Sequence, residues 1–253
     1  MNVEKTGMSI KKILISQQQP MTASPYTVIA EKFGVNFDFK PFFKNEPLSS
    51  REFRAQRINI LDHTAIIFSA RTTIDAFFHL CEELRVKVPE TMKYFCTTEA
   101  VANYLQKHIV YRKRKIFFGD GTPSSIIGLI GTKHKGENFL IATAESTTKD
   151  AVTKIFESQS YTFQTAVFVK PVAQDLKDVD IHSYDLAALF NPADVKALYE
   201  NFPEFKQENM KFLAYGKTVI PAMEEAGLTI EISAPTVEAP SVAKALELYL
   251  SKN

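Results

Sequence analysis

Apolar and polar positions along the chain follow the spacing of strands and helices in turn. Short apolar runs, which indicate buried strands, are each followed by a polar turn and then by apolar residues at helical spacing. The clearest region predicts strand, turn, helix, strand, turn and helix at 64–68, 69–71, 72–84, 92–96, 97–98 and 99–107. Such alternation favours parallel sheets covered by helices on both faces.

A second region repeats this order at nearly the same spacing. Within residues 185–227, a strand at 187–190 leads into a turn at 191–193, and a strand at 210–215 leads into a turn at 216–218. An internal duplication leaves repeats of this kind, and it predicts two similar halves.

The remaining segments extend the same pattern. Further strands are predicted at 11–16, 35–39, 116–118, 138–143, 161–170 and 228–233. Further helices are predicted at 26–33, 49–60, 124–130, 149–159 and 241–250. Ser24 and Gly34 are suited to begin and end the first helix, and residues 41–45 are predicted to form a linker.

Composition and charge narrow the class of protein. The chain of 253 residues is long enough for two domains, and 45% apolar with 23% charged residues is typical of a globular soluble protein. A net charge of +1 creates no field that favours nucleic acid or membrane. Two isolated cysteines indicate reduced thiols in a cytoplasmic protein, and the sequence predicts neither a signal peptide nor a membrane span.

Four small polar turns, at 69–71, 97–99, 191–193 and 216–218, lie where predicted strands end and helices begin. The free N–H groups at a helix amino terminus favour anions. Each turn alone could be only a helix cap worth ~1 kcal/mol. Four related turns, expected to face one cleft, favour a ligand that carries several carboxylates or phosphates.

Familiar catalytic motifs are missing from the sequence. It contains no H-E-x-x-H, G-x-S-x-G, C-x-x-C, Walker or G-x-G-x-x-G pattern, and its five histidines are scattered. The Asp62-His63 pair precedes a strand and is interpreted as structural, while the basic run at 112–115 is interpreted as a solvated connector. These patterns indicate binding more clearly than a reaction.

The order and spacing of several weak motifs resemble the uroporphyrinogen-III synthase family across essentially the whole chain. The segments that carry the resemblance are IFSARTTIDAF at 67–77, ALFNPA at 188–193, AYGKT at 214–218 and APTVEAPSV at 234–242. Residues 87–115 are similar to the version found in Bacteroidetes bacteria.

The resemblance implies an α/β protein of two similar flavodoxin-like lobes with parallel sheets, joined by a two-strand linker. Lobe 1 would comprise residues 1–41 and 171–253, and lobe 2 residues 46–166, with linkers near 42–45 and 167–170. The implied protein is a cytoplasmic monomer that uses no cofactor and no metal.

The family is a hydro-lyase that converts the linear tetrapyrrole hydroxymethylbilane into uroporphyrinogen III, with inversion of the last pyrrole ring, in heme biosynthesis. The resemblance implies that carboxylates of this substrate are bound by Ser69, Arg71, Thr97, Thr98, Asn191 and Thr218. Hinged lobes would close around the substrate and exclude formation of the uninverted product. Few steps of the reaction would then depend on individual catalytic side chains.

The chain departs from the family pattern at several positions. The tyrosine often given the role of proton donor aligns with Phe168, and Tyr161 and Tyr184 are the nearest tyrosines in sequence. Ala70 and Val219 replace a serine and a threonine of the family turns. The catalytic residue is therefore unknown. Two alternatives to an active synthase stay open: a weak or inactive homologue that acts as a tetrapyrrole-binding or partner protein, and a small-molecule sensor.

Overall fold

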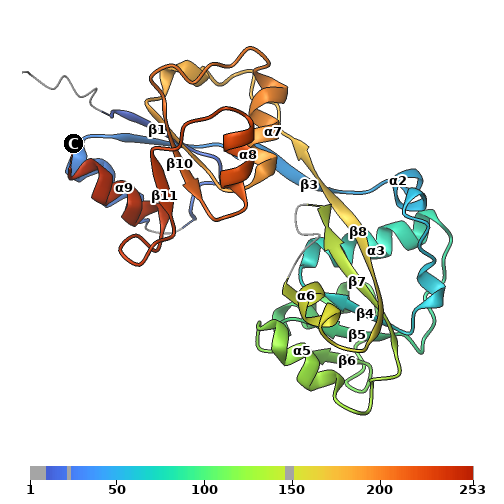
Figure 1. Ribbon diagram of the computed structural model, residues 1–253. Helices are drawn as coiled ribbons and strands as arrows, with labels where there is room; N and C mark the ends of the chain where they lie inside the picture. The colour runs from blue at the N-terminus through green and yellow to red at the C-terminus, as the bar shows by residue number, and fades with distance from the viewer. Residues whose placement is uncertain (1–9, 22–23, 146–150, 253) are drawn as a thin grey trace, which may run out of the picture. The chain divides into compact units, whose positions relative to one another are not determined.

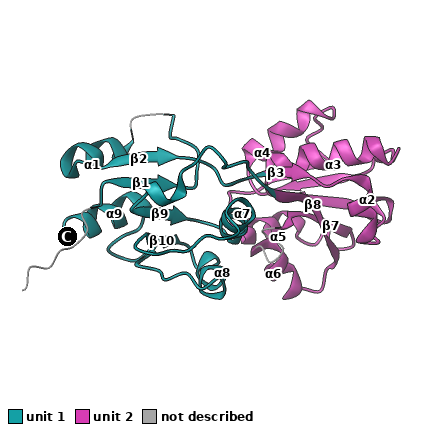
Figure 2. Ribbon diagram, turned by 90° about the horizontal axis from the view of Figure 1, so that it is seen from above, with its two compact units in different colours: residues 1–44, 172–253 teal, residues 45–171 magenta. Residues whose placement is uncertain are grey.

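The computed structural model describes residues 10–21, 24–145 and 151–252, which divide into two compact units. Unit 1 comprises residues 1–44 and 172–253, and unit 2 comprises residues 45–171 (Figure 2). The chain thus leaves unit 1 once and returns to it once. The fold is α/β with two sheets in which parallel pairs predominate, as the sequence predicts (Figure 1).

Unit 1 is built on a parallel sheet whose described strands have the order β11-β10-β9-β1-β2. These strands are β1 (Lys12–Ile15), β2 (Asn36–Phe39), β9 (Leu186–Leu189), β10 (Lys211–Tyr215) and β11 (Ile232–Ala234). The helices are α1 (Pro25–Phe33), α7 (Pro192–Asn201), α8 (Val219–Glu225) and α9 (Val242–Leu250).

The central strands of unit 1 are buried on both faces because helices cover both. Ile13 and Ile15 of β1 belong to the core shared with α1 and α9, whereas Leu14 between them belongs to the core shared with α7 and α8. All three side chains are almost completely buried. A continuous apolar run is the expected signature of such a strand.

Unit 2 is built on a sheet whose described strands have the order β3-β8-β7-β4-β5-β6. They are β3 (Phe43–Pro47), β4 (Ala65–Phe68), β5 (Lys93–Cys96), β6 (Ile116–Phe118), β7 (Asn138–Ala144) and β8 (Thr162–Ala173). The helices are α2 (Ser50–Ala55), α3 (Arg71–Glu83), α4 (Glu99–Tyr104), α5 (Pro123–Ile130) and α6 (Ala151–Glu157). The core residues place α3 and α4 on one face of the sheet and α5 and α6 on the other.

The two sheets share one strand order when the chain of unit 2 is counted from β7. Unit 1 has the order β2-β1-β9-β10-β11, and unit 2 has β8-β7-β4-β5-β6, with β3 added at its edge. Both correspond to the flavodoxin-like order 2-1-3-4-5. Accordingly, β4 and β5 of unit 2 occupy the positions of β9 and β10 in unit 1. The duplication itself stays a prediction.

The chain passes between the units within two paired strands, β3 and β8. Leu48 N–H donates to Phe168 O at 2.9 Å, and Gln174 N–H donates to Phe42 O at 2.8 Å. Phe42 thus pairs with Gln174 and the later Leu48 with the earlier Phe168, so β3 and β8 run antiparallel. Part of the segment predicted as a linker at 41–45 therefore belongs to strand β3.

Helix ends follow the predicted caps in most places. Ser24 accepts the Tyr26 N–H, and Gly34 ends α1 with φ of 64°. The helix predicted over 49–60 is shorter in the structure, where α2 ends at Ala55. Arg57 adopts a left-handed φ of 56°, which prevents the helix from continuing.

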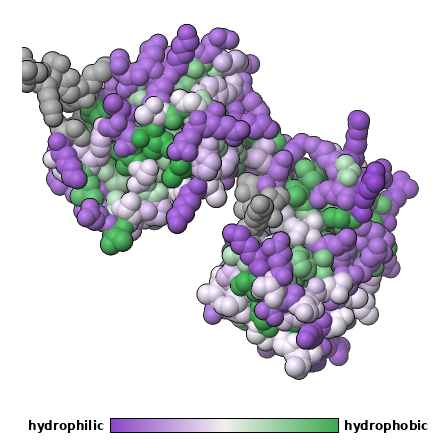
Figure 3. Space-filling model, in the orientation of Figure 1, coloured by the Kyte–Doolittle hydropathy of each residue, from purple (hydrophilic) through white to green (hydrophobic). Residues whose placement is uncertain are grey.

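The surface and the thiols agree with a globular protein. Figure 3 shows that hydrophilic residues predominate on the face drawn, with smaller apolar groups between them. Cys81 and Cys96 are free and buried, as predicted, and burial raises the pKa of each to about 12. In the ranges that the structure describes, no helix is long and apolar enough to cross a membrane.

Candidate functional site

The turn after β9 in unit 1 is closed by its own side chains. Asn191 begins α7 and accepts the Ala193 N–H at 2.9 Å. Asp194 accepts the N–H groups of Phe190 and Asn191 at 2.9 and 3.0 Å. This reciprocal arrangement is a capping box, so the Asn191 side chain has a structural partner at the position predicted for ligand binding.

Asp194 is the most unusual ionisable group of unit 1. Its side chain is 1% exposed, and burial raises its pKa to about 6 although backbone N–H groups act in the opposite direction. Within the described chain, its Oδ1 atom and the buried Ser16 hydroxyl have no hydrogen-bond partner. The Ser16 hydroxyl lies close to the Asp194 carboxyl and partly offsets the rise of its pKa. This pair was not predicted from the sequence, although Asn191 followed by Asp194 is a capping-box signal.

The turn after β10 is open, which here means that no side chain of the turn caps the helix that follows it; in a closed turn a side chain does. Thr218 precedes α8 in a helical conformation, with φ of −80°, and its hydroxyl does not cap the helix. Thr218 and Lys217 are both exposed. Tyr215, at the end of β10, donates its hydroxyl to Pro240 O at 3.1 Å and its ring contacts Phe190 at 5.6 Å between centroids.

The turn after β4 in unit 2 is also open. Ala70 is at the cap position of α3 and has no side-chain hydrogen bond to offer. Ser69 is exposed. The Arg71 guanidinium lies 5.4 Å from the centre of the Tyr104 ring, a cation–π contact that leaves its N–H donors available. The N–H groups of the first turn of α3 therefore face no side-chain acceptor in the described chain.

The turn after β5 is closed. Thr98 begins α4, and its hydroxyl accepts the Val101 N–H at 3.3 Å. Thr97 is buried, its N–H donates to Phe68 O at 3.0 Å, and its carbonyl accepts the Gly121 N–H at 2.8 Å. Because β4 and β5 are neighbours, the structure brings this turn beside the one that holds Ser69 and Arg71.

The six predicted residues thus form one group in each unit. Ser69, Arg71, Thr97 and Thr98 lie at the carboxyl edge of the unit 2 sheet, and Asn191 and Thr218 lie at the carboxyl edge of the unit 1 sheet. In flavodoxin-like sheets this edge is where ligands bind.

The three positions discussed for a proton donor lie elsewhere. Phe168 is 1% exposed and packs against Phe53 and Phe77 in the core of unit 2. Tyr161 precedes β8 and Tyr184 precedes β9, so both are at the amino ends of strands.

Tyr184 is occupied by a local contact as well. Its hydroxyl donates to Asp38 at 2.9 Å, and burial together with this bond raises its pKa to about 12. Tyr215 is by contrast at the carboxyl edge, directly before the open turn of unit 1. Its position after a strand and before Gly216 was a signal that the sequence analysis did not use.

A second polar cluster in unit 2 was also not anticipated. Asp75 accepts the Tyr104 hydroxyl at 2.7 Å, the Lys107 ammonium at 3.0 Å and pairs with His108 Nε2 at 2.7 Å. Burial works to raise the pKa of Asp75, but these bonds outweigh it and lower that pKa. Across the described ranges, no group of three His, Cys, Asp or Glu side chains is placed to hold a metal ion.

Comparison with known proteins agrees with the fold and the order of these elements. The family model described as Uroporphyrinogen-III synthase HemD matches residues 24–244. The uroporphyrinogen-III synthetase of Helicobacter pylori 26695 is 18% identical, with a TM-score of 0.55, and the match covers 96% of this chain and 100% of that one.

A mutant uroporphyrinogen III synthase of the extremely thermophilic bacterium Thermus thermophilus is 15% identical over 96% of this chain and 100% of that one, with a TM-score of 0.47. No curated protein matched. Identities this low show the fold alone, whereas the family model spans most of the sequence. The chain belongs to the uroporphyrinogen-III synthase family.

Proposed function

We propose that the protein is a uroporphyrinogen-III synthase, which cyclises hydroxymethylbilane with inversion of the last pyrrole ring. The family match over residues 24–244 carries this proposal. In this chemistry water leaves the hydroxymethyl group of the first ring, the last ring attacks the resulting cation, and ring closure follows after a spiro intermediate. We further propose that it acts as a cytoplasmic monomer without a cofactor.

Carboxylate binding by the turns of both units would orient the substrate. The substrate has eight carboxylates, and the open turns offer the Ser69 and Thr218 hydroxyls, the Arg71 guanidinium and free helix N–H groups. Charge-assisted hydrogen bonds from such donors are about twice as strong as neutral ones. Thr97, Thr98 and Asn191 complete the proposed set, the last two chiefly by holding their turns in shape.

Tyr215 is our choice for the group that protonates the departing hydroxyl. It lies at the carboxyl edge beside Lys217 and Thr218, whereas Phe168 has no proton to give and is buried. The Tyr215 hydroxyl, which donates to Pro240 O, would donate to the substrate instead. A positioned acid contributes about 10²–10⁴-fold in many enzymes. We expect Tyr215→Phe to lower kcat by about a hundredfold with little change in KM.

A coupled assay tests the proposal. Hydroxymethylbilane is generated fresh, incubated with the purified protein, oxidised and resolved into type I and type III isomers. Dominant type III product supports synthase activity. Type I product alone, at the spontaneous rate, would contradict it.

A tetrapyrrole-binding homologue without activity is the second candidate. The burial of Phe168 and the absence of a side-chain cap at Ala70 favour it, because both positions depart from the family pattern. Saturable binding of the bilane or of uroporphyrinogen, together with type I product alone, would select this candidate over the enzyme.

A further inference from the structure

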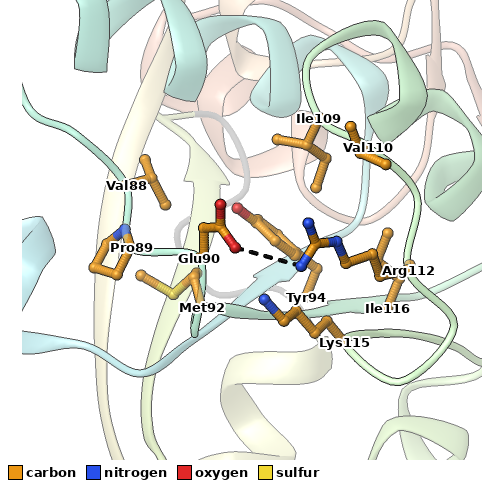
Figure 4. Close-up of a pocket in the computed structure, with 10 residues that line it drawn as sticks. All are labelled: Val88, Pro89, Glu90, Met92, Tyr94, Ile109, Val110, Arg112, Lys115 and Ile116. Atoms are coloured by element: carbon orange, nitrogen blue, oxygen red, sulfur yellow. Dashed lines mark hydrogen bonds and ion pairs between the residues drawn. The ribbon is translucent and has the colours of Figure 1, made fainter.

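A cavity of about 220 Å³ lies in unit 2, away from the turns described above. It is formed between the loop that enters β5 and the loop that enters β6 (Figure 4). Its lining residues are Val88, Pro89, Glu90, Met92, Tyr94, Ile109, Val110, Arg112, Lys115 and Ile116.

The walls of the cavity are mostly apolar. Met92 and Ile116 are almost fully buried beneath it, and Val88 and Ile109 are partly buried at its sides. Val110 is 78% exposed, which is unusual for a valine beside a cavity of this kind. An apolar cavity of about 150 Å³ is large enough for benzene, so this one has room for a substituted aromatic or branched aliphatic group.

Two cations and one carboxylate are placed at the polar side of the cavity. Arg112 pairs with Glu90 at 3.3 Å, so their charges offset one another. Lys115 is half-buried, and its ammonium has no partner among the residues that the structure describes. Figure 4 shows the charged ends of Glu90, Arg112 and Lys115 near one another, between the apolar walls. The positive charge of Lys115 is therefore not offset by a carboxylate of the described lining.

Tyr94 supplies a second free donor. The side chain is 5% exposed, its ring packs on Phe68 and Phe78, and burial raises the pKa of its hydroxyl above the ordinary value. In the described chain that hydroxyl has no hydrogen-bond partner. The hydroxyl faces the cavity and is not enclosed in the core. Because its pKa is raised, it remains protonated and able to donate to an anion.

We propose that this cavity is a binding site for a small carboxylate with an apolar body. The body would pack against Val88, Met92 and Ile109, and the carboxylate would accept hydrogen bonds from Lys115 and Tyr94. In the basic run at 112–115, Arg112 and Lys115 line the cavity and Lys113 and Arg114 do not, while Arg112, Lys113 and Arg114 are all exposed. The interpretation of this run as a solvated connector stays a prediction.

This site is distinct from the proposed tetrapyrrole-binding turns. Met92 and Thr97 flank β5 at its opposite ends, and the five residue-to-residue steps of extended chain between them span roughly 16 Å. Binding in the cavity therefore does not depend on the proposed synthase activity, and either can fail without the other.

Methionine-methyl NMR on the full chain offers a direct test, with 3-phenylpropionate as the probe. Met92 lines the cavity, whereas Met223 is buried in unit 1 and provides an internal control. We expect a saturable shift of the Met92 signal, with a Kd of about 1 mM for a ligand of this size, and no shift of Met223. The neutral 3-phenylpropanol and the non-aromatic succinate are the matched probes, and each should bind at least about tenfold more weakly.

Two variants assign the donors. Lys115→Met should weaken 3-phenylpropionate binding by about tenfold, and Tyr94→Phe by about fivefold, while the neighbouring Lys113→Gln should leave it unchanged. If Met92 shows no saturable shift, or if phenylpropanol binds as well as phenylpropionate, the proposal is wrong. Equal losses from Lys115→Met and Lys113→Gln would also contradict it, because they would indicate only a general effect of charge.

Discussion

The two units use the same sheet order but distribute their helix caps in opposite ways. After β9 in unit 1, Asn191 and Asp194 close the turn, whereas after the equivalent β4 in unit 2 the cap position is Ala70. After β5 in unit 2, Thr98 closes the turn, whereas after the equivalent β10 in unit 1 Thr218 makes no cap. Of the two turns compared in each unit, one is closed and one is open.

This difference separates two roles that one residue type can have. A polar side chain that caps its own helix satisfies the backbone donors and stabilises the fold. An uncapped turn leaves those donors for a ligand. We infer that the open turns of Ser69, Arg71 and Thr218 contribute most to substrate binding, and that Thr98 and Asn191 contribute most to stability.

The largest expected effect concerns the closed turn of unit 1 and its dependence on pH. Folding raises the pKa of Asp194 from 3.8 to about 6, so between these values the folded chain holds a proton that the unfolded chain has lost. The protonation of Asp194 stabilises the folded chain fully below about pH 4. As the pH rises to about 6 this stabilisation is lost, which lowers the free energy of unfolding by up to about 3 kcal/mol.

Asp194→Asn cannot ionise but keeps an oxygen for the Phe190 and Asn191 N–H groups. The variant should therefore gain up to about 3 kcal/mol in free energy of unfolding relative to wild type between about pH 4 and pH 7. Urea unfolding of both proteins over this range measures the difference. Parallel pH profiles would show that Asp194 is not buried as described.

The next largest effect concerns the open turn of unit 2. Arg71→Gln removes a guanidinium whose contact in the described chain is the Tyr104 ring. We expect KM for hydroxymethylbilane to rise by about tenfold, the value of a charge-assisted hydrogen bond, with thermal stability nearly unchanged. Arg114→Gln, which removes an exposed arginine of the same unit, is the control. Equal KM values for the two variants would refute a binding role for Arg71.

A reciprocal exchange of caps sharpens the comparison. Asn191→Ala should destabilise the first turn of α7 by about 1 kcal/mol, and Ala70→Asn should stabilise that of α3 by a similar amount. Hydrogen exchange of peptides that cover these helices reports each turn separately. Changes of the same sign in both helices would contradict the assignment of open and closed turns.

The smallest effect is expected at the open turn of unit 1. Thr218→Val keeps the shape of the side chain and removes a hydroxyl that caps nothing. We expect KM to rise by about fivefold, as for the loss of one hydrogen bond from an uncharged donor, while the unfolding midpoint stays the same. Thr98→Val should do the reverse, because Thr98 caps α4. If Thr218→Val destabilises the protein as much as Thr98→Val does, Thr218 is structural.

Much of the fold could be predicted from periodicity and caps. The strands predicted at 64–68 and 138–143 contain the apolar runs 65–68 and 139–142 because helices cover both faces of the sheet. Ser24 and Gly34 begin and end α1 as expected. Residues 41–45 were predicted as a linker, and the structure forms strand β3 at Phe43–Pro47. Its strand conformation depends on pairing with β8, a partner more than a hundred residues away.

The turns that hold the candidate site residues were predictable in position but not in detail. Spacing alone placed the polar turns at strand ends, yet Thr98 and Thr218 have the same residue type and differ only in backbone conformation. The buried Asp194 and the cavity beside Lys115 arise from packing between segments distant in sequence. No local pattern of residues encodes such burial.

The ratio of type III to type I uroporphyrinogen formed by the wild-type protein tests the central claim most directly. If the turns of this chain bind and fold hydroxymethylbilane as proposed, type III product dominates and forms faster than spontaneous closure. Product that is type I alone, at the rate seen without protein, would contradict the proposed function.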